Sequence, residues 1–258
     1  MTIHDLSVAT GERTEHRSSV ALLVLVAAGL TSLALVGNYA YFGSSATMLR
    51  HGTDWLAVPV CGVAGGLAGG LFSRFVIAAA RGLPAMRGRV IKQHPIAFAF
   101  VCGLGVAVCG LVSGDLIYGT GYAQVKAALD SGMPLPWHFS LLKLVATAFS
   151  AVSGIPGGIF SPSLAVGAGL GSDVAQLFPT APLGAIMLLG MVSYFAGVVQ
   201  APITAFVIVT EMSDNHAMVV PLMAAALIAY ATSRLVCHEG IYHALAKGFL
   251  QTGPDVTR

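Results

Sequence analysis

Long apolar stretches separated by short polar or glycine-rich segments dominate the sequence. After a polar and charged lead-in at residues 1–17, the chain is apolar over 18–42, 55–80 and 95–113. About 20 consecutive apolar residues span a bilayer as a helix. The pattern therefore predicts three membrane-spanning helices in the first half of the chain.

The second half alternates shorter apolar stretches with turns. We expect helices over 136–152, 162–178, 183–199 and 218–236, and shorter ones from about 123, over 201–215 and near the end of the chain. The segment at 201–215 has only about ten apolar residues, which is too short to cross a bilayer alone. The sequence thus predicts an all-α, multi-pass integral membrane protein with tilted and broken helices.

Composition narrows the class of function. A mean hydropathy of +0.81 with only 9% charged residues excludes a soluble domain, and a net charge of +2 argues against a nucleic-acid partner. The cysteines at 61, 102, 109 and 237 have no metal-ligand spacing, so we interpret them as small core residues. No catalytic motif is present, so we expect neither an enzyme nor a metal or other cofactor.

The segment from Ser153 to Gly171, SGIPGGIFSPSLAVGAGLG, combines glycines, prolines and apolar residues without a charge. Irregular backbone at membrane depth is stable only inside protein or beside a water-filled cavity. We expect Pro162 to begin a helix, which leaves the amides around Ile159 and Phe160 free. Free amides at the positive end of a helix dipole form a site for an anion.

Gly158-Ile159-Phe160-Ser161-Pro162 resembles the GxFxP signature of the CLC family of chloride channels and chloride/proton antiporters. The resemblance implies that the amides of Ile159 and Phe160 bind chloride, the transported ligand. Residues 239–245, EGIYHAL, resemble the start of the last CLC helix, which implies that the Tyr242 hydroxyl donates to the same ion. The residues that shape this turn are Gly154, Pro156, Gly157, Gly158, Ser161 and Pro162.

The resemblance covers residues 18–250, which we treat as a membrane domain between the 1–17 lead-in and a tail at 251–258. It corresponds to the C-terminal half of the CLC fold, the second of two inverted repeats. The first-half G(K/R)EGP motif with its gating glutamate is not found in the sequence. The expected function is chloride transport by a protein that is incomplete on its own, and the alternatives are a non-transporting truncated or split-gene fragment and a transporter of another anion.

The resemblance also implies partners. CLC proteins are homodimers, and the matching interface helices are 18–42 and 202–236; a separate first-half polypeptide is a second expected partner, beside the lipid bilayer. The basic segment 81–92 predicts a cytoplasmic loop, and we expect a bacterial inner membrane.

Three features have competing interpretations. The glycines between Gly62 and Gly70 indicate close helix packing rather than function. Lys143 is expected to snorkel from a helix end rather than line an ion path. Glu211 is expected to meet backbone amides or Arg234 rather than to carry protons.

Overall fold

The computed structural model describes residues 3–37, 40–43, 47–50, 52–80, 94–155 and 157–245, and every regular element within them is a helix. The chain divides into two units, Met1–Ala40 and Tyr41–Arg258. The first unit contains one helix, α1 (Ile3–Val36), which ends where Gly37 takes a positive φ of 80°. The expected helix at 18–42 therefore starts earlier and ends earlier, because the polar lead-in continues the helix and Gly37 stops it.

The second unit contains the remaining helices. They are the short 3₁₀ helix η1 (Gly52–Leu56), α2 (Ala57–Ala80), α4 (Pro95–Ser113), α5 (Tyr122–Ser131), α6 (His138–Val152), α7 (Phe160–Ala175), α8 (Leu183–Val199), α9 (Pro202–Ser213), η2 (His216–Met218) and α10 (Val219–Val236). Residues 241–245 form a further helical turn. The basic segment 81–92 lies outside the described residues.

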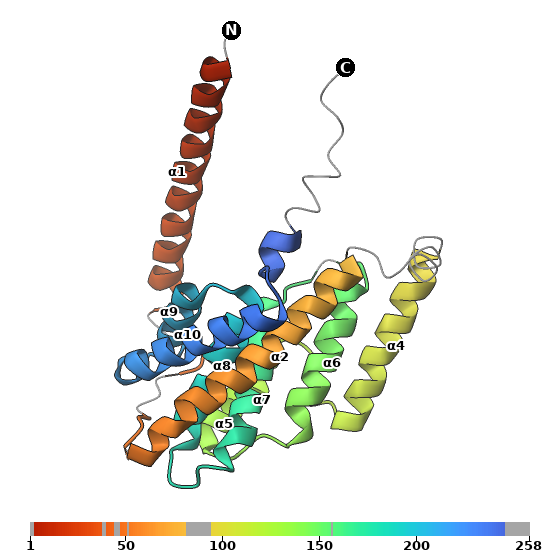
Figure 1. Cartoon of the computed structure of the whole chain (residues 1–258), viewed down its shortest axis with the longest axis vertical. Coiled ribbons are helices and arrows are strands. Elements are labelled where there is room, and N and C mark those ends of the chain that lie inside the picture. Colours follow the sequence, from red (N-terminus) through yellow and green to blue (C-terminus); the bar gives the residue numbers. More distant parts are fainter. Residues whose placement is uncertain are drawn as a thin grey trace. The chain divides into compact units, whose positions relative to one another are not determined.

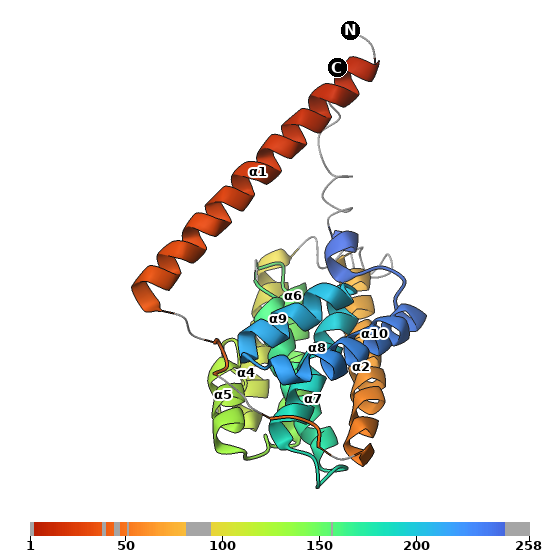
Figure 2. The ribbon, with the colours of Figure 1, turned by 90° about the vertical axis from the view of Figure 1, so that its left-hand side faces the viewer.

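Helix α8 is the centre of the second unit. Every residue from Ala185 to Val198 is buried, as expected of a helix that is hydrophobic on all sides. Helices α2, α7, α9 and α10 pack against it, and Figures 1 and 2 show them around it. The four cysteines are free and buried, which confirms their interpretation as core residues.

The glycines of α2 let two helices approach it closely. A Cβ atom on Gly65 would lie 2.5 Å from Ser193 Cβ on α8, and one on Gly66 would lie 2.5 Å from Ala229 O on α10. Gly69 faces α8 in the same way as Gly65. Gly65 and Gly69 therefore contact α8, whereas Gly66 contacts α10. The predicted packing role is confirmed.

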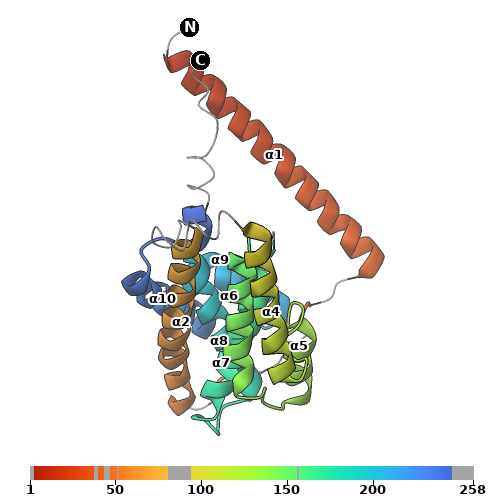
Figure 3. The ribbon, with the colours of Figure 1, turned by 90° about the vertical axis from the view of Figure 1, so that its right-hand side faces the viewer.

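Helices α4 and α6 lie side by side (Figures 1 and 3). In the described part of the chain, three segments are long and apolar enough to cross a membrane: Gly52–Ala80, Pro95–Ser113 and His216–Val236. Only 22% of the residues in the apolar stretch of α4 are buried within the structure. Such a surface is stable in contact with lipid or another apolar protein surface.

Candidate anion-binding site

The turn between α6 and α7 is organised by Ser153 and Gly154. Ser153 follows the last residue of α6; its hydroxyl donates to Ser150 O at 2.8 Å and accepts from the amide of Ile155 at 3.2 Å. Gly154 has a φ of 82°, a conformation that strains any residue with a Cβ atom. These contacts end α6 and redirect the chain toward α7. Pro156 lies outside the described residues.

Gly157 and Gly158 leave the main chain open just before α7. Both are exposed, and a Cβ atom on Gly158 would meet nothing within 4 Å. Ile159 then caps α7 with helical backbone angles, and its carbonyl accepts from Ser163 N at 3.0 Å. No side chain caps this helix end.

Helix α7 begins at Phe160, so the expected start at Pro162 is two residues too late. Pro162 is the third residue of the helix, with Ser161 before it. The first amides of any helix have no partner within it, so a proline here still costs no hydrogen bond. The amides of Ile159, Phe160 and Ser161 have no acceptor among the described residues, and they lie at the positive end of the helix dipole.

The side chains of Ile159 and Phe160 fix this helix end to the protein. The Phe160 ring meets the Phe195 ring of α8 edge to face, with centroids 4.9 Å apart. Ile159 packs against a hydrophobic cluster that includes Tyr194 and Ile241. Because both side chains anchor the turn, these two residues can offer a ligand only their main-chain groups.

Residues 241–245 join the same cluster. Ile241 and Ala244 are buried members of it, whereas Tyr242 is 48% exposed. The Tyr242 hydroxyl has no hydrogen-bond partner among the described residues. The structure thus brings the segment carrying Tyr242 and the turn carrying Ile159 to one hydrophobic cluster, and the hydroxyl is free to donate.

Ser163 was not singled out from the sequence. Its hydroxyl is buried and has no hydrogen-bond partner in the described part of the chain. It lies one helical turn after Ile159. The residue type alone gives no signal, because buried serines in helices usually donate to the preceding turn.

Lys143 does not snorkel, so that expectation is wrong. The side chain is buried, and its ammonium donates to Ile117 O at 2.6 Å and to Gly119 O at 2.7 Å. These carbonyls belong to the glycine turn before α5. Lys143 therefore holds that turn against α6.

Glu211 contacts neither of its expected partners, backbone amides or Arg234, among the described residues, so that expectation is also wrong. Glu211 is exposed, and Arg234 donates instead to the Tyr230 hydroxyl at 3.0 Å. Tyr230 lies one turn earlier on α10, on the same helix face as Arg234. No group of three or more potential metal ligands occurs in the described ranges.

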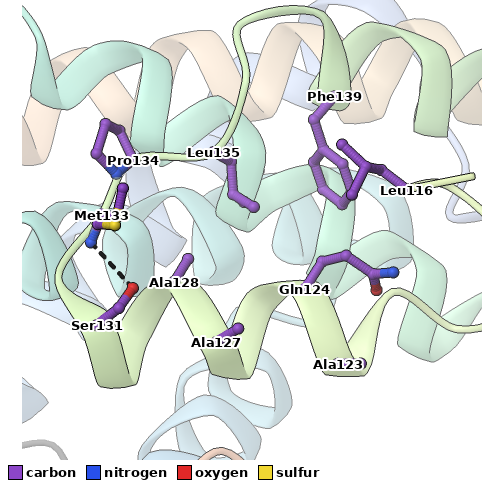
Figure 4. A pocket seen from close by; sticks show the side chains of 10 residues that line it. All are labelled: Leu116, Ala123, Gln124, Ala127, Ala128, Ser131, Met133, Pro134, Leu135 and Phe139. Carbon is purple, nitrogen blue, oxygen red and sulfur yellow. Dashed lines mark hydrogen bonds between the residues drawn. The ribbon is translucent and has the colours of Figure 1, made fainter. Parts of the chain in front are cut away.

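A cavity of about 370 Å³ lies between α5 and the segment that leads into α6. Figure 4 shows Leu135 and Phe139 pointing toward α5. On the α5 side, the cavity is lined by residues that include Ala127 and Gln124. None of its lining residues is charged, and none belongs to the turn or to residues 241–245. The uncapped end of α7 therefore remains the candidate site for an anion.

The chain matches the family described as voltage gated chloride channel over residues 8–234. The H(+)/Cl(−) exchange transporter ClcA of Cronobacter sakazakii is 30% identical over 200 residues, which are 74% of this chain and 42% of that protein. ClcA of Yersinia pestis bv. Antiqua (strain Angola) is 26% identical over 252 residues, 90% of this chain and 51% of that protein. The chain thus spans about half the length of the curated relatives it matches.

Solved structures agree on the fold. A CLC-type fluoride/proton antiporter superposes with a TM-score of 0.63 at 22% identity, over 77% of this chain and 48% of that one. A slow cyanobacterial Cl−/H+ antiporter gives a TM-score of 0.62 at 22% identity, over 81% of this chain and 51% of that one. The predicted all-α membrane fold and its likeness to one half of a larger transporter are confirmed.

Proposed function

This chain belongs to the voltage-gated chloride channel family, and from that premise we propose that it forms the C-terminal half of a transporter that moves chloride across a membrane. The observation that carries the proposal is the uncapped start of α7. Three amides there have no acceptor among the described residues, and exposed glycines precede them.

The type of hydrogen-bond donor in the proposed site determines how it binds an anion. The amides of Ile159 and Phe160 and the hydroxyl of Tyr242 are neutral donors, which replace part of the water shell of chloride without binding it permanently. A transported ion must be held in this way, because a site that binds too tightly does not release it.

The side of the anion site that faces away from α7 is formed by a first half of the family fold. This half belongs either to the same polypeptide or to another. The chain spans about half the length of its relatives, and an open row of amides is costly against lipid. A facing half supplies both the protein wall and the further donors that a dehydrated anion requires.

Two further parts of the proposal rest on family likeness. The exposed apolar side chains of α9 and α10, among them Ile203 and Val220, supply an interface for a homodimer. The bacterial origin of the relatives described above supports a place in a bacterial inner membrane.

Anion flux tests the proposal. The chain is reconstituted in liposomes alone and together with a first-half polypeptide from a relative, and chloride efflux is followed with an electrode. We expect efflux only with both halves, and competition by other halides identifies the preferred ion. No efflux in either sample would favour a non-transporting fragment, and selective efflux of a different anion would correct the substrate.

A further inference from the structure

The segment that leads to Tyr242 is tied to the end of α8 by Gln200. Gln200 caps α8 with left-handed backbone angles, φ 57° and ψ 34°. Its amide nitrogen Nε2 donates to Cys237 O at 2.6 Å and to Ser233 Oγ at 3.3 Å. The Ser233 hydroxyl in turn donates to Gly197 O at 2.6 Å. One side chain therefore connects the ends of α8 and α10 with the turn that follows α10.

That turn lies directly against α8. A Cβ atom on Gly240 would stand 2.6 Å from Val199 O, so only glycine allows this approach. The carbonyl of Gly240 then accepts from Ala244 N at 3.0 Å, which starts the helical turn at 241–245. The contact of Gln200 with Cys237 therefore helps to set the position of this helical turn, together with the buried side chain of Ile241.

We propose that Gln200 is a positioning residue that holds the Tyr242 hydroxyl in the anion site. The inference rests on the proposed function. Tyr242 is half exposed and its hydroxyl has no partner among the described residues, so its place depends on the backbone that leads to it. The 2.6 Å bond to Cys237 O fixes that backbone five residues before Tyr242. Gln200 acts through the main chain and need not contact the anion.

Three variants separate this role from general stability. Gln200→Met keeps the length of the side chain but removes both donated hydrogen bonds. Gln200→Lys restores a donor at a similar distance from the backbone. Gln176→Met is the matched control, because Gln176 also caps a helix, α7, and is exposed.

Two measurements are made on each variant. Hydrogen exchange of the purified chain in detergent reports the protection of amides in 237–245. Chloride efflux with the first half present reports the chloride concentration at half-maximal rate. For Gln200→Met we expect exchange of this segment to rise about two- to tenfold, the range that loss of one neutral hydrogen bond supplies. The half-maximal chloride concentration should rise in parallel. Gln200→Lys should recover part of both effects, and Gln176→Met should match the unmodified chain.

A double variant completes the test. If Gln200 acts through Tyr242, adding Gln200→Met to Tyr242→Phe should not raise the half-maximal chloride concentration further. The positioning role would be overturned by unchanged amide exchange of 237–245 in Gln200→Met. It would also be overturned if the effects of the two substitutions on the half-maximal chloride concentration added in full. If efflux from the unmodified protein did not depend on the chloride concentration, the proposed function would be overturned instead. Amide exchange would still show whether Gln200 holds the turn.

Discussion

The ammonium group of Lys143 donates to the carbonyl oxygen of Ile117 at 2.6 Å, from a side chain that is only 2% exposed. The same group donates to Gly119 O, so two carbonyls of the turn before α5 depend on it. A charge this deep in apolar surroundings is stable only when its donors are used. Lys143 is thus a structural cation of the α5–α6 region.

Lys143→Met is expected to lower the free energy of unfolding by about 1–3 kcal/mol, because it leaves two carbonyls without their donor. Thermal unfolding in detergent measures the loss. Lys126→Met is the control, since the Lys126 ammonium only lies over the Tyr122 ring, 5.8 Å from its centroid. Equal melting temperatures for the two variants would contradict the structural role.

Gly190→Ala is expected to separate α7 from α8. A Cβ atom on Gly190 would meet the backbone of Gly167 and lie 2.5 Å from Gly171 N. Overpacking of this kind costs about 1–3 kcal/mol. Gly103→Ala on α4 is the matched control, because its Cβ atom would meet nothing within 4 Å and alanine favours a helix. Comparable stability of both variants in thermal unfolding would argue against close contact of α7 and α8.

Tyr242→Phe removes one hydroxyl and tests the proposed anion donor. A hydrogen bond to a charged group contributes about 1.5–3 kcal/mol, so the half-maximal chloride concentration for efflux should rise about tenfold or more. Tyr118→Phe is the control, because Tyr118 is similarly exposed and its hydroxyl donates only a 3.4 Å bond to Ala107 O. An equal chloride response in both variants would remove Tyr242 from the site.

Much of the fold follows from the sequence because apolar length and helix-breaking residues act locally. The bounds of α4 and α8 match the predicted segments, since proline precedes or opens each helix and glycine or a left-handed residue closes it. The glycines and prolines before α7 predict its turn for the same reason. Pro162 does not mark the first helical residue, because the helix already begins two residues earlier, at Phe160.

Contacts between distant segments could not be predicted. The sequence shows a lysine in an apolar helix, but its partners Ile117 and Gly119 lie more than 20 residues away in the chain. Gln200 likewise looks like an ordinary polar residue until Cys237 is brought beside it. Both contacts depend on tertiary packing, which cannot be inferred from a single sequence.

The proposed homodimer predicts which apolar face is covered. Ile203 on α9 is 71% exposed and lies in the segment that family likeness assigns to the interface. A cysteine at this position should cross-link to a product of twice the mass under mild oxidation in the membrane, since the native cysteines are buried. Leu111→Cys on α4, at 75% exposure, should stay monomeric. Cross-linking at Leu111 but not at Ile203 would place the interface elsewhere.

Phe160 distinguishes a main-chain site from a side-chain site. Its ring contacts Phe195 edge to face at 4.9 Å, whereas its proposed role in binding belongs to its amide. Phe160→Leu keeps the amide and removes the aromatic contact, so we expect a loss of about 1 kcal/mol in thermal unfolding. The half-maximal chloride concentration should stay within about twofold of the unmodified protein, because the lost contact is not made to the ion. Phe195→Leu removes the same contact from the other side and should lose at least as much, because Phe195 is only 2% exposed. The double variant should lose less than the sum, as expected when two residues share one contact. If Phe160→Leu instead changes the preference among halides as strongly as Tyr242→Phe, the ring itself lines the ion path, and a role for Phe160 through its amide alone would be wrong.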